Sequence, residues 1–192
     1  MGTLKTTNIE SISGSGTVTL GTSGETFTVP SGVTVNMSSA TQTGVGGANT
    51  PAFAAYAPSD QDSLSSGTWT KLTMDAEFFD SDGKYDTSNY RFTPTVAGKY
   101  MFGAQIYADA TNTNEESSLA FYKNGTRFLY KEESADNINT QQLTGVITLD
   151  SDDYVELYLK ISVAGGGTFA MDMDGTTSNN RCYWYGYKLI GA

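Results

Sequence analysis

Alternation of apolar and other side chains is the feature that most limits how this chain can fold. The segment 154–163, YVELYLKISV, places Val155, Leu157, Leu159, Ile161 and Val163 on one face. The segment 99–107, KYMFGAQIY, places Tyr100, Phe102, Ala104 and Ile106 on one face in the same way. A period of two residues is typical of a β-strand that packs one side against a core. The sequence therefore predicts an all-β chain.

Turn signals separate these strands. The segment 118–130, SLAFYKNGTRFLY, has two apolar runs around Asn124-Gly125, and Asn-Gly is the strongest short-range signal for a hairpin. Strands recur about every 10 to 15 residues, and no helical pattern lies between them. This spacing favours a sandwich or a jelly roll.

Composition excludes several functions. A chain of 192 residues can bury one sizeable core. Its net charge of −10, with 11 Lys and Arg, argues against nucleic-acid binding. The same charge argues against adsorption on an anionic membrane. The chain has no histidine, which excludes Ser-His-Asp and Cys-His sites. Cys182 is the sole cysteine and we expect a buried, inert thiol. No apolar run reaches membrane-spanning length, and residues 1–13 lack the apolar region of a secretory signal.

The N-terminal part carries a short repeat. Glycine recurs every eight residues at Gly16, Gly24 and Gly32, and the residues between them alternate. We predict short strands at 17–20 and 26–29 with a turn at each glycine. Such strands bury too little alone, so we infer that partner chains cover them. The alternative is a β-meander that packs on its own domain.

The composition changes after this repeat. The segment 41–51, TQTGVGGANTP, has three glycines and almost nothing to bury, which indicates a linker. We predict an N-terminal β-repeat stalk or anchor with its glycine-rich linker over residues 1–48, and one β domain over residues 49–192.

A spaced motif in the β domain points to a family. Its six residues are Asp80, Tyr85, Phe92, Gly98, Tyr100 and Phe102. They stand at the spacings of a signature of the complement C-one-q globular head, a jelly roll of the tumour-necrosis-factor type, which the chain resembles from residue 51 onward. Met74 and Ala104 occupy two signature positions where the family has aromatic residues. The matched residues fit structural roles in a core, and we do not predict a site from them.

This resemblance implies a ten-stranded jelly-roll sandwich that assembles as a trimer. Four tyrosines on the second faces of strands are then expected to form subunit contacts: Tyr158, Tyr183, Tyr185 and Tyr187. The loop tips at 109–118 and 164–168 are where a receptor would be touched.

The N-terminal repeat resembles segments of bacteriophage fibres and spikes. Together, the two resemblances predict a non-enzymatic trimeric protein of the virion surface, made in the host cytoplasm: a head fibre, a capsid decoration or a tail-fibre tip. Its expected partners are its own copies, other virion proteins through the N-terminal segment, and a glycan or protein of the host. The alternatives are a secreted receptor-binding ligand of the same head family and a carbohydrate-cleaving tail spike.

Acidic residues leave two further possibilities open. A glycosidase would need paired carboxylates, and the candidate pairs are Asp172 with Asp174 and Asp152 with Asp153, although solvated loop charge is the simpler interpretation.

We predict no cofactor, with calcium as the alternative. The two segments with oxygen ligands for calcium are DSDGKYD, with Asp80, Asp82 and Asp86, and EESADNIN, with Glu133, Asp136 and Asn137.

Overall fold

The computed structural model describes residues 26–34, 49–134, 140–172 and 180–190. The chain separates into two units, Met1–Thr43 and Gly44–Ala192. The predicted boundary between residues 48 and 49 stays a prediction. No helix among the described residues has the length and apolar content that crossing a membrane requires.

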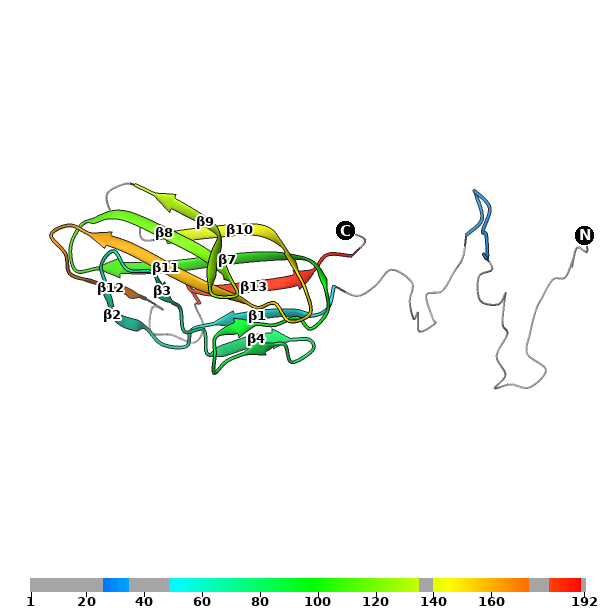
Figure 1. The fold of residues 1–192 in the computed structure, drawn as a ribbon, viewed down its shortest axis with the longest axis horizontal. Coiled ribbons are helices and arrows are strands. Elements are labelled where there is room, and N and C mark those ends of the chain that lie inside the picture. The colour runs from blue at the N-terminus through cyan, green and yellow to red at the C-terminus, as the bar shows by residue number, and fades with distance from the viewer. Residues whose placement is uncertain (1–25, 35–48, 135–139, 173–179, 191–192) are drawn as a thin grey trace, which may run out of the picture. The chain divides into compact units, whose positions relative to one another are not determined.

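The second unit is a sandwich of two antiparallel sheets (Figure 1). The seven-stranded sheet has the order β2 (Gln61–Ser65), β12 (Thr168–Met171), β7 (Gly98–Ala110), β13 (Tyr183–Lys188), β1 (Ala52–Tyr56) and β4 (Ala76–Asp80), with β10 (Thr140–Leu149) also paired to β7. The six-stranded sheet has the order β5 (Tyr85–Asp86), β6 (Arg91–Phe92), β11 (Val155–Val163), β8 (Asn114–Lys123) and β9 (Thr126–Glu133), with β3 (Thr70–Lys71) also paired to β11.

The predicted all-β sandwich is therefore confirmed. The described residues form thirteen strands where ten were predicted. The additional three, β3, β5 and β6, have two residues each and are too short to show alternation in the sequence.

Strand β7 pairs with three other strands of its sheet, because two of them share one of its edges. β10 pairs along the other edge from Gly98 to Tyr107, while β13 pairs with residues 100–105 and β12 with residues 108–110. β1 then pairs with β13, so that Ala52 faces Tyr187. The first and last strands of the head consequently lie side by side.

Aromatic side chains from both sheets fill the core. The ring of Phe53 stacks on Phe92, with centroids 4.5 Å apart, and meets Trp184 edge-on at 4.7 Å. Further large side chains that are fully buried are Tyr100, Phe102, Phe121, Phe169, Leu72, Met74, Ile106, Leu119 and Ile147. Burial of each such side chain stabilises the fold by about 1.5–3 kcal/mol.

Two turns show how local sequence sets the chain direction. At the β8–β9 hairpin, Asn124 and Gly125 have φ of 51° and 73°, the left-handed pair that a two-residue hairpin requires, so the predicted turn is confirmed. Between β11 and β12, Gly165 and Gly166 have φ of 72° and 78°, and nothing lies within 4 Å of a side chain added at either. This second turn is an open tip.

Of the N-terminal unit, the structure describes residues 26–34. The amide of Val33 donates to the carbonyl of Pro30 at 3.3 Å, and Gly32 has φ of 82°, so the turn predicted at this glycine is confirmed. Residues 26–30 form no strand in the single chain, in contrast to the prediction for 26–29, and Phe27 is 68% exposed. The strand predicted at 17–20 and its glycines lie outside the described residues.

Candidate subunit interface

Three of the four tyrosines predicted to form subunit contacts lie in a row on the outer face of the seven-stranded sheet. The residues of β13 alternate, so Trp184 enters the core while Tyr183, Tyr185 and Tyr187 face outward. Tyr185 lies between Gly103 of β7 and Ala54 of β1 in the register of the ladders. These small neighbours leave room for the phenol ring to lie flat along the sheet.

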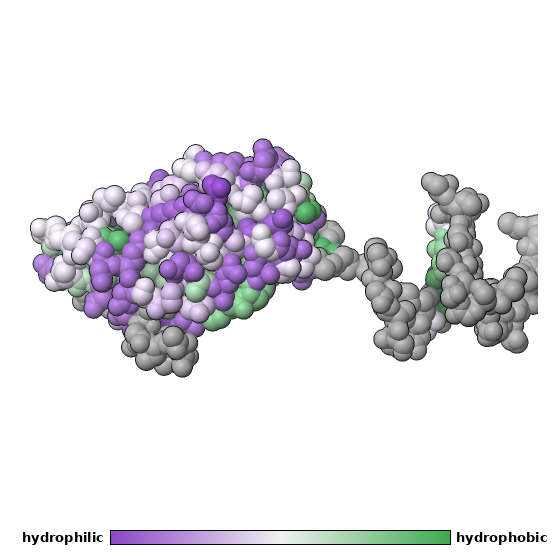
Figure 2. All heavy atoms as spheres, turned by 90° about the horizontal axis from the view of Figure 1, so that it is seen from below, coloured by the Kyte–Doolittle hydropathy of each residue, from purple (hydrophilic) through white to green (hydrophobic). Residues whose placement is uncertain are grey.

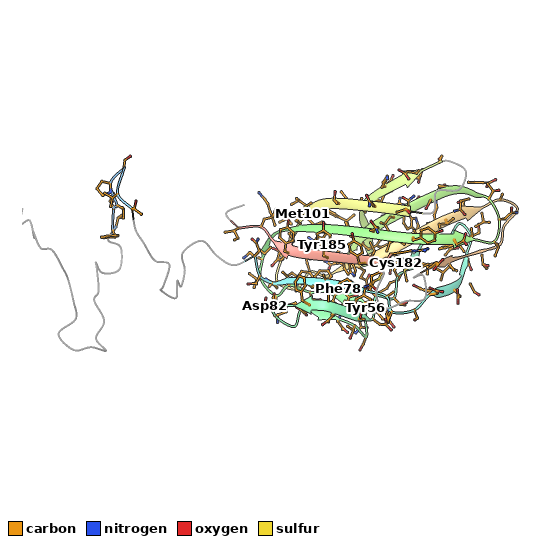
Figure 3. The ribbon with its side chains drawn as sticks, turned by 180° about the vertical axis from the view of Figure 1, so that it is seen from behind. Tyr56, Phe78, Asp82, Met101, Cys182 and Tyr185 are labelled. Atoms are coloured by element: carbon orange, nitrogen blue, oxygen red, sulfur yellow. The ribbon has the colours of Figure 1, made fainter. Side chains whose placement is uncertain are left out.

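Gly103 is needed for this arrangement. A Cβ atom at this position would overlap the ring atoms of Tyr185, and all three nearest atoms belong to that ring. Figure 3 shows Tyr185 and Met101 on this face of β13 and β7. The glycine therefore lets the partly exposed ring of Tyr185 lie over the middle of the sheet.

The aromatic surface continues onto the edge strand β4. The ring of Phe78 stacks on Tyr56 of β1 with centroids 4.5 Å apart, as Figure 3 shows, and its side chain is still 51% exposed. Phe79 is 53% exposed, and on β10 Val146 is 49% exposed. Figure 2 shows a hydrophobic margin beside an otherwise mostly hydrophilic face of the head. Exposed apolar side chains gathered on one face mark interaction sites.

The middle of this face is uncharged. Outward residues of β10 opposite β7 are Gln142, Thr144 and Val146, and the amide of Gln142 donates to Gln105 at 2.8 Å. Charged side chains lie at the two ends, where Lys99 is exposed and the guanidinium of Arg181 stacks on Tyr107 at 4.7 Å. Depletion of charge with enrichment of tyrosine is the composition of protein–protein interface cores.

The structure does not bring Tyr158 to this face. Tyr158 belongs to β11 of the six-stranded sheet, where its ring stacks on Tyr122 with centroids 3.9 Å apart. Burial raises its pKa to about 12, and the nearby Glu156 carboxylate acts in the same direction. We therefore define the candidate subunit interface as the outer face of β10, β7, β13, β1 and β4.

The signature residues lie inside the head. Tyr85, Phe92, Tyr100 and Phe102 are buried, and the Tyr85 hydroxyl donates to the carbonyl of Met74 at 2.7 Å. Met74 and Ala104, which depart from the signature, are buried as well. At Gly98 an added Cβ would lie 2.8 Å from Cε of Lys188, so the end of the Lys188 side chain lies against this glycine.

In the two segments considered for calcium, the carboxylates already accept hydrogen bonds from nearby residues. The Asp80 carboxylate accepts the amides of Tyr85 at 2.8 Å and Asp82 at 3.2 Å, and the Asp86 carboxylate accepts three donors from Ser88 and Asn89. Bonds from Asn89 lower the pKa of Asp86. Among the described residues no three acidic, histidine or cysteine side chains are grouped to hold a metal ion.

Glu133 also has local partners. Its carboxylate pairs with Lys131 and accepts from Gln141 at 3.1 Å, and these two hydrogen bonds lower its pKa. Asp136 and Asn137, which were considered with it, lie outside the described residues.

The aspartates considered for a glycosidase differ in exposure and in hydrogen-bond partners. Asp153 is 7% exposed and accepts the amide of Asp150 and the side-chain amide of Asn124, whereas Asp152 is exposed. The expectation that both are solvated is therefore wrong for Asp153. Asp172 lies 3.9 Å from Arg181, and its proposed partner Asp174 lies outside the described residues.

Cys182 has the environment that its sequence predicts. The thiol is buried, and desolvation raises its pKa to about 12. Its sulfur lies 3.2 Å from the amide of Tyr107 of β7, and Cys182 directly precedes β13. The thiol is consequently unreactive at neutral pH.

A hollow of about 440 Å³ lies where β2, β7 and β12 meet. It is lined by Asp62, Ser63, Asp109, Ala110, Thr111, Thr168, Phe169 and Ala170. Asp109, Ala110, Thr111 and Thr168 belong to the tips predicted at 109–118 and 164–168. Phe169 and Ala170 lie just beyond the second tip, and Asp62 and Ser63 were missed because β2 shows no clear alternation.

Comparison with known proteins gives similar sequences and similar solved structures. No protein-family model matches the chain. The phage-like element PBSX protein XkdV of Bacillus subtilis (strain 168) is 29% identical over 123 residues, which cover 58% of this chain and 18% of that protein. The match thus spans less than a fifth of the relative's length.

One similar solved structure is the globular domain of zebrafish complement 1qA protein. It has a TM-score of 0.46 and 16% identity, over 74% of this chain and 98% of the zebrafish chain. The resemblance to phage proteins predicted from the sequence has a counterpart in the XkdV match.

Proposed function

We propose that this chain is a structural protein of a bacteriophage virion whose jelly-roll head assembles as a homotrimer through the candidate subunit interface. The observation that carries the proposal is the uncharged aromatic face centred on Tyr185. The similarity to a protein of a phage-like element supports the virion context. The head would be displayed on the virion surface, as a head fibre, a capsid decoration or a tail-fibre tip.

The physical argument for assembly is the exposed surface itself. Phe78, Phe79 and Val146 are each about half exposed, which is unfavourable in a free monomer. A face that repeats around a closed cyclic axis covers this surface in every copy. A trimer follows from the resemblance to the complement head family, whose members are expected to assemble in this way.

The remaining parts of the proposal concern the two ends of the chain. We propose that the N-terminal segment joins the head to other virion proteins and that the head serves adhesion to the host or stabilises the capsid without enzymatic activity. The tips around 109–111 and 164–168, which frame the hollow, provide a polar surface for such contacts.

The experiment that tests the proposal is size-exclusion chromatography with light scattering on two proteins, the full chain and residues 49–192. A trimer in both places the assembly in the head and agrees with the interface defined above. A trimer of the full chain alone places assembly in the N-terminal segment. A monomer in both contradicts the trimer and the role given to the aromatic face.

A further inference from the structure

The outer face of the six-stranded sheet carries a second aromatic surface, on the opposite side of the sandwich from the candidate subunit interface. We name it the aromatic platform and define it by its five residues: Trp69, Tyr122, Arg127, Tyr130 and Tyr158. Trp69 lies 6.1 Å from Tyr122 between ring centroids, and Tyr122 stacks on Tyr158 at 3.9 Å. The rings therefore form a continuous row across β8 and β11.

Arg127 is placed between two of these rings. Its guanidinium carbon lies 4.4 Å from the centroid of Tyr130 and 5.3 Å from that of Trp69. A guanidinium that stacks on rings through its flat face keeps the N–H groups at its edge for other acceptors. The side chain is held in place by the rings, so a ligand that binds it orders little that is not already ordered.

Among the described residues, Arg127 differs from the lysines of this sheet in having no carboxylate partner, a property that it shares with Arg91, which stacks on Tyr154. Lys71 pairs with Glu156 at 2.6 Å, Lys160 pairs with Glu116, and Lys131 pairs with Glu133. Within the described residues, Arg127 contacts rings and forms no ion pair. The platform thus offers an exposed, oriented positive group with its hydrogen-bond donors unused.

The rings are accessible while the surface below them is closed. Tyr130 is 50% exposed and Trp69 is partly exposed, whereas Ala120 beneath the row is 0% exposed. Ala120 lies between Tyr158 and Tyr130 in the strand ladders. The platform is therefore a flat, firm surface and has no apolar groove for a peptide helix.

We propose that the aromatic platform binds an acidic saccharide, in which a sugar ring carries a carboxylate. The carboxylate would take two N–H donors from Arg127, the geometry that guanidinium groups favour, and the C–H face of the sugar would pack on Tyr130 and Trp69. This inference rests on the proposed role of the head in adhesion and names the class of molecule that the head contacts.

The net charge of −10 does not oppose this inference. At physiological ionic strength, exposed charges more than about 8 Å apart are largely screened, so the contacting groups decide the local attraction. Strands β3, β6, β8, β9 and β11 hold six of the eleven basic residues: Lys71, Arg91, Lys123, Arg127, Lys131 and Lys160. The six strands of this sheet also hold six acidic residues, Asp86, Glu115, Glu116, Glu132, Glu133 and Glu156, so their formal charge is zero while the rest of the chain carries −10.

The test is a titration of the full chain with oligogalacturonate, followed by calorimetry and by tryptophan fluorescence. Trp184 is fully buried, so a change in fluorescence reports on Trp69. We expect saturable binding that quenches the emission. The fully methyl-esterified oligomer, which has the same sugar rings without charge, should bind at least about tenfold more weakly, as the loss of one charged hydrogen-bonded pair implies.

Variants locate the site. Arg127→Gln should weaken binding about tenfold or more, and Tyr130→Ser should weaken it severalfold. Lys84→Gln, which removes a partly exposed positive charge between β4 and β5, should leave binding unchanged. Thermal unfolding of each variant establishes that it is folded. Absence of binding, equal binding of the methyl ester, or unchanged binding by Arg127→Gln would overturn the inference.

Light scattering on the same samples separates this inference from the proposed assembly. A monomer that binds oligogalacturonate through Arg127 contradicts the trimer and leaves the saccharide site intact. A trimer that does not bind overturns the saccharide site alone. A change of mass in Arg127→Gln or Tyr130→Ser would show that the platform is covered by another copy of the chain, which also overturns the inference.

Discussion

The ammonium group of Lys123 lies 2.7 Å from the Oδ2 oxygen of Asp153, joining the end of β8 to the turn before β11. The same carboxylate accepts the amide of Asp150 at 2.7 Å and the side-chain amide of Asn124 at 2.6 Å. Because all four residues border the hairpin and the acidic turn, one carboxylate fixes two loops. The hydrogen bond from Lys123 has the largest part in lowering the pKa of Asp153 to about 2.

Acid should therefore weaken the head through Asp153. The folded-state pKa lies below the unfolded value near 3.8, so the stabilisation is complete above about pH 4 and is lost as the pH falls toward 2. We expect Asp153→Asn to lower the free energy of unfolding at pH 7 by on the order of 1 to 2 kcal/mol, and by much less at pH 2. Urea unfolding at both pH values measures this. Asp152→Asn, in the same turn but exposed, should have little effect, and an equal loss in both variants would contradict the assignment.

A side chain at Gly103 should disturb the interface face. In Gly103→Ala the new methyl group overlaps the ring of Tyr185, and we expect a loss of about 1–3 kcal/mol in the free energy of unfolding. Removal of the ring in the double variant Gly103→Ala, Tyr185→Ala should recover part of this loss, so the two effects should not add. Additive losses would mean that the overlap with Tyr185 is not the cause.

A charge at the centre of the aromatic face should dissociate the oligomer. Tyr185→Glu places a carboxylate in the middle of the proposed contact, where burial without a partner is costly, and we expect a monomer by light scattering. Tyr130→Glu, an equally large change on the other sheet, serves as the matched control and should leave the mass unchanged. Dissociation by Tyr130→Glu instead would place the contact on the six-stranded sheet.

Calcium should not stabilise the loop around residues 80–86. The carboxylates of Asp80 and Asp86 already accept backbone amides, so a cation would have to displace these donors. We expect the same Tm in excess calcium chloride and in excess EDTA. An increase in Tm with calcium that is lost in Asp80→Asn would show a site that the hydrogen bonds do not reveal.

Much of the sandwich could be predicted from alternation alone. The faces predicted for residues 99–107 and 154–163 agree with the burial of β7 and β11, because each of these strands packs one face on the core. The hairpin at Asn124-Gly125 agrees because its turn is set by local backbone geometry. Short-range chemistry was sufficient in both cases.

The grouping of surface residues could not be predicted in the same way. Alternation shows that Tyr158 and Tyr185 point away from the core, but it does not show that they belong to different sheets, since long-range pairing decides this. Arg127 of β9 and Trp69, which directly precedes β3, are 58 residues apart in the sequence. The guanidinium of Arg127 lies over the Trp69 ring, although no sequence motif links the two residues. Phe78 and Phe79 are adjacent and both exposed, next to a register shift between Ala54 and Ala55 that interrupts the alternation.

The adjacency of β1 and β13 has a consequence for the use of this protein as a scaffold. Since Ala52 faces Tyr187, a peptide fused after the last strand would emerge at the same end of the head as the N-terminal linker. The β11–β12 tip is the better insertion point for a displayed epitope, because Gly165 and Gly166 are exposed and make no close contact. An epitope inserted there would leave both aromatic faces uncovered and accessible to their own partners.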